Sequence, residues 1–470
     1  MLRYFRINDP YRLITIFLLL LIIRLPVFIS SDLITLPELN YMLVGEKLTG
    51  GAKLYSQVWD CIAPLSAFIY NGIDYLFGRS QLTYQILAYI LVCCQIFIFN
   101  SFLINSKAYA ENTYVPGIIY ALLSSICYDM FTLTPFLIGL TFLLLALRNI
   151  FQHIEFRSKR DEDILNIGLF IGLATVSYQQ FAIFAICTLL IFALFTGTVG
   201  RRYLMMLFGF FLPILIAGSY FFLTNRFTDF MYSFLSPFLV IGKIWYFSFG
   251  ELLILFAIPA FYFLMALFRM VQGARLTNYQ GRLTQSMIVW LIFSIGFILI
   301  SDEYSPSVYL ILIPIASFYI AHHFLIYRRR GLAEISFILF LVGTVTTGVF
   351  SYSTPQWFGK YFDDKDYVVN LKNYEEIKGE RILVLDDNIR PYYYAQSATP
   401  FLNWQMSEEV FNNLDYYDNL TLIHEGIVND KPDIIIDSNN RMPKIFDKIP
   451  GLKELYFKGR DGNYHLKASN

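Results

Sequence analysis

Long apolar runs separated by short polar stretches occupy most of the chain between residues 13 and 352. A run of roughly 18 or more apolar residues is long enough to cross a bilayer as a helix, in which all backbone hydrogen bonds are made internally. We therefore predict a polytopic α-helical membrane protein with about eleven transmembrane helices. The predicted spans cover residues 13–30, 81–105, 113–128, 132–150, 164–181, 182–198, 203–224, 248–268, 286–301, 307–327 and 333–352.

Basic residues are concentrated in every second loop between these spans. Cytoplasmic loops of membrane proteins carry an excess of Lys and Arg, which predicts a cytoplasmic N-terminus. An odd number of spans then places the C-terminal region outside, on the same side as the loop 31–80. The basic loops are those with Lys107; Arg157, Lys159 and Arg160; Arg201 and Arg202; Arg269, Arg275 and Arg282; and Arg328 to Arg330.

The composition changes near residue 354, after which the chain is polar and rich in tyrosine. Short β-branched runs at 381–387 and 432–438 predict two buried strands. Helical spacing predicts one helix over 407–429, and an Asp-Gly pair predicts a hairpin over 455–466. We therefore divide the chain into a transmembrane domain, 1–354, which includes the first loop, and a soluble extracytoplasmic α/β domain, 355–470.

The overall composition agrees with the membrane class. The 470 residues are 56% hydrophobic and only 15% charged, whereas soluble domains are about 25% charged. The 36 basic residues balance the 36 acidic ones, which gives no nucleic-acid footprint. The five cysteines lie mostly in apolar runs and have no zinc-site spacing, so neither a disulfide framework nor a zinc site is expected.

The loop 31–80 is the main candidate for a functional site. It is too polar to cross a membrane, yet it carries many order-promoting side chains, and long loops of this kind are usually functional. Its candidate residues are the carboxylates Asp32, Glu38 and Asp60, the aromatic residues Tyr41, Tyr55 and Trp59, and Lys53.

Charged residues at membrane depth are expensive and are functional candidates by default. Arg24, Asp129 and Glu251 all fall at the outer face, where snorkelling or a local salt bridge is the alternative. The sequence Asp302-Glu303-Tyr304 forms an outer turn before a later span. It either is a solvated turn, or completes the site from the opposite side or binds a divalent metal ion.

Several short motifs resemble the GT-C superfamily of integral-membrane glycosyltransferases, in the branch related to protein O-mannosyltransferases and aminoarabinose transferases. In that family an acidic motif, Asp-Glu-x-x-Tyr, is followed by a segment ending in Pro-Pro-Leu. The corresponding stretches here are Arg24-Leu-Pro, Glu38-Leu-Asn-Tyr41, Trp59-Asp60, Ala63-Pro64-Leu65 and the Tyr309 to Pro314 pattern.

The resemblance implies transfer of a sugar from a polyprenyl-phosphate donor to an acceptor at the extracytoplasmic face. It implies that Glu38, with Asp60 or Asp32, acts as the carboxylate base. The donor phosphate would be bound by cations, for which the candidates are Arg24, Lys53, Arg226 and Lys243. Tyr41, Tyr55, Trp59 and Tyr309 are the candidates for substrate contact. The only cofactor considered is a divalent metal ion, which is one of the alternatives for the turn at Asp302.

The sequence departs from the family pattern at two positions. Pro37 stands where the family has its first acidic residue, and Ala63 stands at the first Pro of Pro-Pro-Leu. The alternative function is therefore a catalytically degenerate subunit or scaffold of a cell-envelope complex, bound to an envelope protein partner. On a further alternative, Glu38 begins an interfacial amphipathic helix and Asp60 caps a helix. In either case membrane lipids surround the chain, and a bacterial inner membrane is the simplest location.

Overall fold

The computed structural model of the chain describes residues 1–29, 33–156, 161–239, 244–273, 276–327, 329–353, 355, 359, 362, 365–369 and 374–467. Within these residues, seven helical segments are long and apolar enough to cross a membrane. Helices α12 and α13 pass the same test together, although the chain bends by 70° between them. The chain is thus an integral membrane protein. The elements concerned are α2 (Tyr11–Ile29), α5 (Gln81–Asn105), α7 (Pro135–Phe156), α10 (Gly200–Leu223), α12 (Phe249–Leu255), α13 (Ala257–Gly273), α14 (Asn278–Ile300), η3 (Pro306–Leu312) with α15 (Ile313–Ile326), and α16 (Arg330–Ser353).

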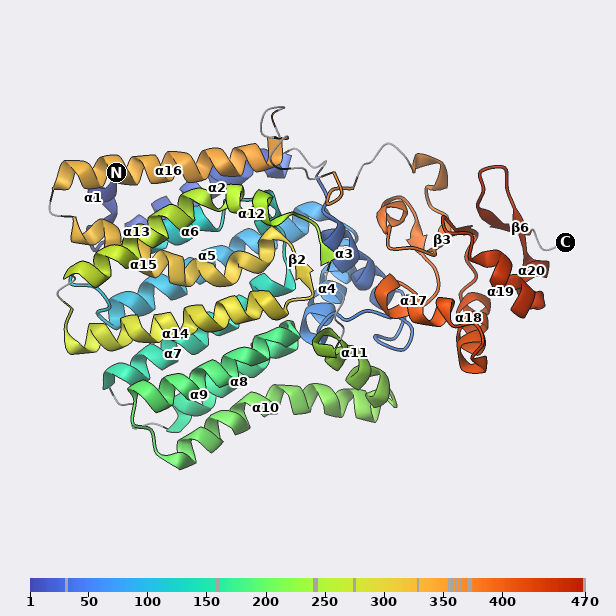
Figure 1. Cartoon of the computed structure of the whole chain (residues 1–470), viewed down its shortest axis with the longest axis horizontal. Helices are drawn as coiled ribbons and strands as arrows, with labels where there is room; N and C mark the ends of the chain where they lie inside the picture. Colours follow the sequence, from blue (N-terminus) through green and yellow to red (C-terminus); the bar gives the residue numbers. More distant parts are fainter. Residues whose placement is uncertain are drawn as a thin grey trace.

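Every predicted span contains helix, but three of the helices are too short to count by this criterion: α6 (Val115–Leu123), α8 (Asp161–Ser177) and α9 (Ile183–Phe195). The number eleven is therefore not confirmed. These short helices lie beside the long ones (Figure 1), and α6 is buried along its whole length. A helix that is packed among other helices does not need the length of one that faces lipid on its own.

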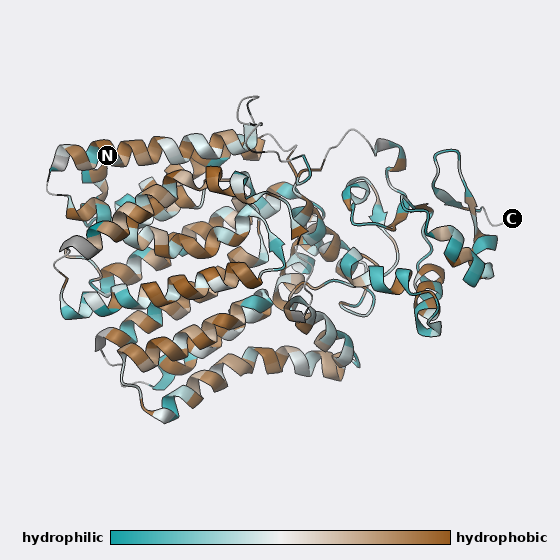
Figure 2. Cartoon of the chain, in the orientation of Figure 1, coloured by the Kyte–Doolittle hydropathy of each residue, from teal (hydrophilic) through white to brown (hydrophobic). Residues whose placement is uncertain are grey.

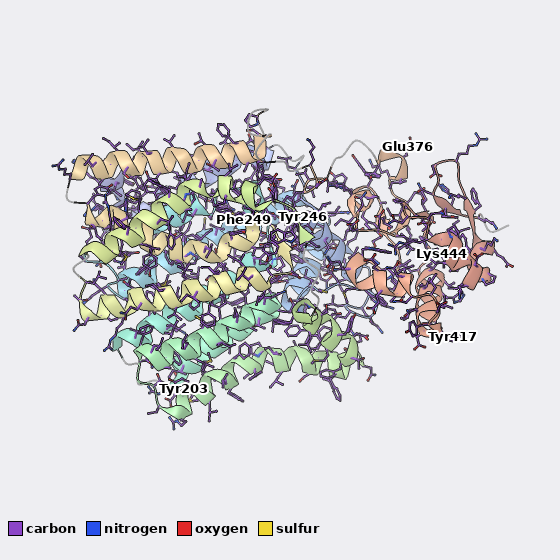
Figure 3. The ribbon with its side chains drawn as sticks, in the orientation of Figure 1. Tyr203, Tyr246, Phe249, Glu376, Tyr417 and Lys444 are labelled. Carbon is purple, nitrogen blue, oxygen red and sulfur yellow. The ribbon has the colours of Figure 1, made fainter. Side chains whose placement is uncertain are left out.

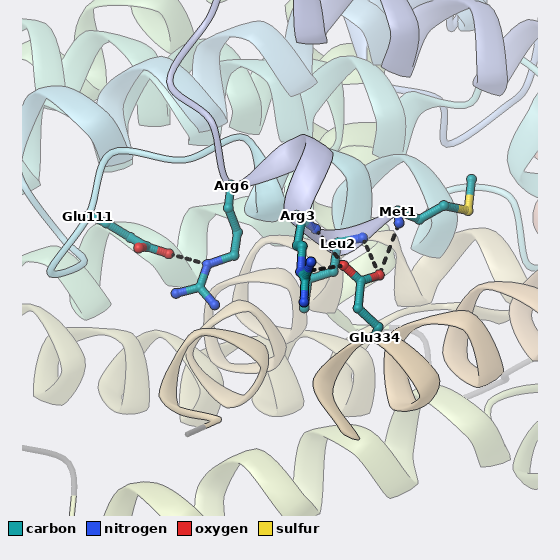
Figure 4. Close-up of polar contacts among 6 residues, drawn as sticks. All are labelled: Met1, Leu2, Arg3, Arg6, Glu111 and Glu334. Carbon is teal, nitrogen blue, oxygen red and sulfur yellow. Dashed lines mark hydrogen bonds and ion pairs between the residues drawn. The ribbon is translucent and has the colours of Figure 1, made fainter. Parts of the chain in front are cut away.

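The N-terminal residues lie at one end of the bundle and the C-terminal region lies beyond the other end (Figure 1). The first helix, α1 (Leu2–Phe5), is bound to α16 through Glu334 (Figure 4). The Glu334 carboxylate accepts hydrogen bonds from the amino group of Met1 (2.9 Å) and the backbone N–H groups of Leu2 (3.0 Å) and Arg3 (2.9 Å). Arg6 forms an ion pair with Glu111 (2.6 Å), so the loop after α5 lies at this same end.

The opposite end of the bundle is built from the first loop and short elements of later loops. It contains α3 (Leu36–Thr49), α4 (Pro64–Phe77), the 3-10 turns η1 (Tyr128–Phe131) and η2 (Gln179–Ala182), and α11 (Phe227–Leu239). Strands β1 (Ile244–Trp245) and β2 (Glu303–Tyr304) pair in parallel here. Figure 3 shows Tyr246 at this end, and its ring packs against Tyr367 of the C-terminal region, with 4.9 Å between the ring centroids. The candidate site residues of the first loop are therefore placed between the bundle and the C-terminal region.

The C-terminal region contains a five-stranded sheet in the order β4-β3-β5-β7-β6. β3 (Arg381–Val384) pairs in parallel with β4 (Gln396–Ser397) and with β5 (Ile434–Ile436), and β7 (Tyr464–Leu466) pairs antiparallel with β5 and with β6 (Tyr456–Lys458). The region is more hydrophilic than the bundle (Figure 2). Its remaining elements are η5 (Glu375–Ile377), η6 (Arg390–Tyr393), α17 (Trp404–Asn412), α18 (Tyr417–Asn429), α19 (Met442–Lys448) and α20 (Pro450–Leu455).

Alternate residues of β3 enter different hydrophobic cores, because successive side chains of a strand point to opposite faces. Ile382 and Val384 belong to the core that continues into the helical bundle. Leu383 belongs to a second core with residues of α17 and α19, among them Trp404, Phe411 and Ile445. The sheet is therefore covered on both faces, which explains why β3 is apolar after Arg381 and β5 is apolar throughout.

The predicted strands at 381–387 and 432–438 and the predicted hairpin are confirmed by β3, β5 and the β6–β7 pair. The single helix over 407–429 is wrong. Two helices are present, α17 and α18, and the first begins at Trp404 after the N-cap Asn403, whose side chain accepts from Met406 N. Asn403 was overlooked because the Ser-Glu-Glu sequence that follows also resembles a helix start.

Candidate functional site

The first loop folds into two helices whose starting points are fixed by proline and by Thr35. Thr35 is the N-cap of α3 and its hydroxyl accepts from Glu38 N (3.3 Å). Pro37 lies in the first turn, where no intrahelical N–H bond is lost. The alternative of an interfacial helix is wrong, because nine residues of α3, including Glu38, are buried. Asp60 does not cap α4 either, since the N-cap is Ala63.

Glu38 is held by side chains from other elements of the structure. It is 2% exposed and accepts hydrogen bonds from Thr132 Oγ1 (2.7 Å) and Gln81 Nε2 (3.3 Å). Burial raises the pKa of the Glu38 carboxyl group to about 7, and these hydrogen bonds hold it from rising further. A carboxylate with a pKa near neutral pH is suited to accept a proton.

Four further carboxyl groups are linked to Glu38 by successive electrostatic contacts through Asp129 and Glu303, and we call the five together the carboxylate cluster. Its members are Glu38, Asp60, Asp129, Asp302 and Glu303. Burial raises the pKa of each group. The charges of Asp302, Asp129 and Asp60 raise the pKa of Glu303 further, and the charge of Asp129 adds to that of Glu38. Buried acidic groups that are coupled in this way cannot all be ionised at low cost.

Each of the other four members also has a defined partner. Asp60 accepts from Asn40 Nδ2 (3.0 Å) and Ile62 N (2.8 Å). Asp129 accepts from Ser307 N (2.6 Å) and from the Tyr367 hydroxyl group. Asp302 accepts from the hydroxyl of Tyr178, and Glu303 is hydrogen-bonded to the hydroxyl of Tyr41.

The solvated turn at Asp302-Glu303-Tyr304 is wrong. Glu303 and Tyr304 form strand β2, Tyr304 is buried, and the two carboxyl groups are half-buried toward the cluster. Glu251, by contrast, lies at a helix end and reciprocally caps Ser248, which is the local role expected there. Sequence spacing alone does not distinguish Glu251 from Asp302 and Glu303.

The carboxyl groups of the cluster are not arranged as the ligands of a metal ion. Among the residues that the structure describes, no three His, Cys, Asp or Glu side chains are grouped so that they could hold a metal ion. The five carboxyl groups use protein donors instead, as set out above. We therefore assign no step to a metal ion.

Arg24 is a predicted cation that packs beside the segment carrying Thr132, one of the partners of Glu38. It is fully buried, donates from Nη2 to Ser124 O (3.0 Å) and lies over the ring of Phe131, 4.7 Å from its centroid. Phe131 precedes Thr132, the residue that donates to Glu38. Nε and Nη1 of Arg24 have no hydrogen-bond partner within the described part of the chain, so the guanidinium has unused donors in a buried place.

The other predicted cations are elsewhere. Arg226 bridges the α10–α11 corner to the first loop by donating to Leu54 O (3.3 Å). Lys53 is exposed on the surface of the loop. Lys243 and the predicted carboxylate Asp32 lie outside the described residues.

Of the predicted aromatic contacts, only Tyr41 touches the carboxylate cluster. Tyr55 is 3% exposed, donates to Ile62 O (2.8 Å) and packs against Phe221 and Phe230, which is a core position. Trp59 is half-buried and turns toward the C-terminal region, with its ring edge on Phe401. Tyr309 faces an apolar cavity instead.

That apolar cavity has a volume of about 230 Å³ and lies at the bend between α12 and α13. Its walls come from α12, α13, α14, η3 and α15 and are almost entirely hydrocarbon. They include Phe249, Leu252, Phe256, Phe263, Tyr309 and Ile313. Phe249 is 69% exposed, so the cavity wall continues to the outer surface of the bundle (Figure 3).

Several site residues could not be identified from the sequence. Thr132, Gln81, Tyr178 and Tyr367 are common residue types in unremarkable segments, and only contact with a carboxyl group distinguishes them. Asp129 was marked by its place beside apolar runs. Glu303 is marked in the same way, as part of the Asp302-Glu303-Tyr304 stretch between two apolar segments.

Comparison with solved structures finds similar helix arrangements. The chain is similar to ArnT from Cupriavidus metallidurans bound to undecaprenyl phosphate, with 13% identity, a TM-score of 0.48 and coverage of 68% of this chain and 62% of that one. It is also similar to the oligosaccharyltransferase AglB from Archaeoglobus fulgidus in complex with an inhibitory peptide and a dolichol-phosphate. There the identity is 9%, the TM-score 0.49, and the coverage 98% and 74%.

No family model matches the sequence, and no curated protein matches it. The chain spans less than two thirds of the length of ArnT. At these scores the two structural similarities say nothing about the reaction or substrate of this chain, which must be argued from its own residues.

Proposed function

We propose that this chain is a membrane glycosyltransferase that moves a sugar from a polyprenyl-phosphate donor to a hydroxyl acceptor at the extracytoplasmic face. The observation that carries the proposal is Glu38, a buried carboxyl group with a pKa of about 7 that is held by Thr132. Arg24, a fully buried arginine with unused donors, lies over the ring of Phe131, the residue before Thr132. The motifs around Glu38 and Trp59, which resemble those of GT-C enzymes, support the same function.

In the proposed reaction, the acceptor hydroxyl attacks the anomeric carbon of the donor sugar. The new glycosidic C–O bond forms as the bond from that carbon to the phosphate oxygen breaks, and the polyprenyl phosphate leaves with the bonding electrons. Glu38 takes the hydroxyl proton, for which its pKa of about 7 is suited. Arg24 compensates the charge on the leaving phosphate, a role for which a buried guanidinium is suited.

The apolar cavity at the α12–α13 bend supports a lipid donor. Its hydrocarbon walls suit an isoprenoid chain, and its continuation to the lipid-facing surface would allow the rest of the chain to lie in the membrane. Tyr309, the predicted substrate contact, would then touch the prenyl tail and not the sugar.

Native mass spectrometry of the detergent-purified protein tests this function. We expect a co-purifying polyprenyl phosphate or its sugar conjugate, whose occupancy falls at least about tenfold in Arg24→Met and is restored in Arg24→Lys. Arg269→Met is the matched control, because Arg269 lies over Tyr327 at the other end of the bundle. The proposal would be overturned in favour of a scaffold if the only lipid found is bulk phospholipid and a protein partner co-purifies in a stoichiometric amount.

The role of Glu38 is tested with the donor so identified. Glu38→Gln should lower transfer by roughly 10²–10⁴-fold, the usual contribution of a general base. Because the group must be ionised, the wild-type rate should rise with pH around 7. Full transfer by Glu38→Gln, or a rate that is flat from pH 5 to 9, would exclude Glu38 as the base.

A further inference from the structure

A second, polar cavity of about 600 Å³ lies between α3 and the C-terminal region. Its size falls within the usual range for small-molecule sites. One wall comes from the first loop and includes Lys47, Gln57 and Trp59. The other comes from the C-terminal region and includes residues before, within and after the sheet strands: Arg381, Gln396, Phe401, Glu425, Asn429 and Asp430.

The two walls are held together by hydrogen bonds that join α3 and the first loop to residues 399–403. Lys47 Nζ donates to Thr399 O, Trp59 N donates to Pro400 O (2.9 Å), and Asn403 N donates to Trp59 O (3.1 Å). Thr399 itself has φ +65°, a region that a β-branched residue rarely adopts, and its N–H is bound by Asp430 (2.9 Å). Such strain persists only where the surrounding structure imposes it and is concentrated at ligand-binding places.

The charge of the lining disfavours an anionic ligand. Three carboxyl groups, Glu46, Glu425 and Asp430, face two cations, Lys47 and Arg381. Both cations already have partners, since Arg381 is paired with Asp430 and Lys47 donates to Thr399 O. A phosphate group would therefore meet more negative than positive charge.

The uncharged part of the lining suits a ligand with many hydroxyl groups. Gln396 and Asn429 each present amide donors and a carbonyl acceptor. Gln57 presents its amide donors, because its side-chain carbonyl accepts from Lys53 N (2.9 Å). The ring of Trp59 adds a flat apolar face, held in place by the ring of Phe401 at 5.2 Å and 85°. Alternating hydroxyl groups and apolar C–H faces are the chemistry of a sugar ring.

This cavity is separate from the carboxylate cluster. Glu38 and Lys47 are nine residues apart on α3, which is two and a half turns of about 3.6 residues, so they lie on opposite faces of the helix. Trp59 lines the cavity while its neighbour Asp60 is bound by Asn40 of α3. The carboxylate cluster and the polar cavity thus lie on opposite faces of α3.

We infer that the cavity between α3 and the C-terminal region binds a neutral carbohydrate, through the amide groups of Gln57, Gln396 and Asn429 and the ring of Trp59. If the chain is a transferase, this carbohydrate is the part of the acceptor that extends away from the reacting hydroxyl. That second statement rests on the proposed function, whereas the binding itself does not.

Isothermal titration of the full chain in detergent tests the inference, with maltotetraose, cellotetraose and chitotetraose as probes and a hexapeptide of Gly and Ser as the competing class. We expect saturable binding of at least one oligosaccharide. The double variant Gln396→Ala/Asn429→Ala should weaken that binding about tenfold or more, and Trp59→Phe should weaken it less. Asn439→Ala, an exposed amide in the same region, is the matched control and should change nothing.

The inference is overturned if none of the three oligosaccharides binds, or if the double variant binds as well as the wild type. It is also overturned if the peptide binds and the double variant abolishes that binding, which would assign the cavity to a polypeptide. Binding is measured without turnover, so the two proposals can fail separately. If the chain binds a carbohydrate but no polyprenyl phosphate, this inference is supported and only the transferase function is overturned.

Discussion

At the scale of single residues, the environment of Glu38 determines its chemistry. The sequence indicated which carboxylate to consider, but its pKa depends on burial and on hydroxyl and amide donors contributed by Thr132 and Gln81. These donors come from separate segments of the chain, and nothing in their own sequence marks them. The same holds for Arg24, whose unused donors become apparent only when its burial is known.

The raised pKa of Glu38 predicts a pH-dependent stability. Between 4.5 and about 7 the folded state keeps a proton that the unfolded chain has released, so the free energy of unfolding falls as pH rises through this window. At about 1.4 kcal/mol per pH unit, the loss is on the order of 3 kcal/mol and is complete above pH 7. Glu38→Gln removes this loss.

Thermal unfolding of wild type and Glu38→Gln in detergent at pH 5 and pH 8 measures the effect. We expect the variant to gain stability relative to wild type at pH 8 and to gain much less at pH 5. Glu409→Gln, an exposed carboxyl group, is the control and should behave like wild type at both values. An equal difference between Glu38→Gln and wild type at both pH values would contradict the raised pKa.

At the scale of elements, the helices of the bundle are held at distances that only small residues permit. On α8 and α10, Gly168, Gly172 and Gly209 lie where the two backbones approach most closely. A Cβ atom on Gly168 would lie 2.0 Å from Met206 O, and one on Gly209 would lie 2.3 Å from Leu165 O. Small residues at such positions are the usual means of close packing between membrane helices.

Gly168→Ala is therefore expected to destabilise the bundle, because the backbone of α10 must move away to admit the methyl group. A cost of about 1–3 kcal/mol is typical of overpacking. The measurement is the melting temperature of the purified protein, compared with that of Gly281→Ala, where a Cβ meets nothing within 4 Å. A melting temperature for Gly168→Ala equal to that of the control would mean that α8 and α10 do not pack in this way.

At the scale of the whole molecule, Lys47 joins the first loop to the C-terminal region. Its Nζ donates to Thr399 O, and burial, with the nearby charge of Arg381, lowers its pKa to about 7. Between pH 7 and 10.5 the unfolded chain holds a proton that the folded state has released. The free energy of unfolding therefore rises with pH across this window.

Lys47→Met should flatten this rise, because the methionine cannot titrate. Chemical denaturation at pH 7 and pH 9.5 gives the measurement, with exposed Lys53→Met as the matched control. We expect the wild type and the control to gain stability between the two pH values and Lys47→Met to gain less. The same gain in all three proteins would show that Lys47 is not buried at this interface.

The sequence by itself determined the elements whose periodicity is local: the apolar helices, the strands β3 and β5, and the hairpin β6–β7. Run length and side-chain period depend only on neighbouring residues, so these could be predicted without the fold. The carboxylate cluster, the apolar cavity and the polar cavity were decided by tertiary structure alone. Each unites residues distant in the chain, such as Glu38 with Asp129 and Lys47 with Thr399. Both burial and charge coupling depend on which distant groups meet.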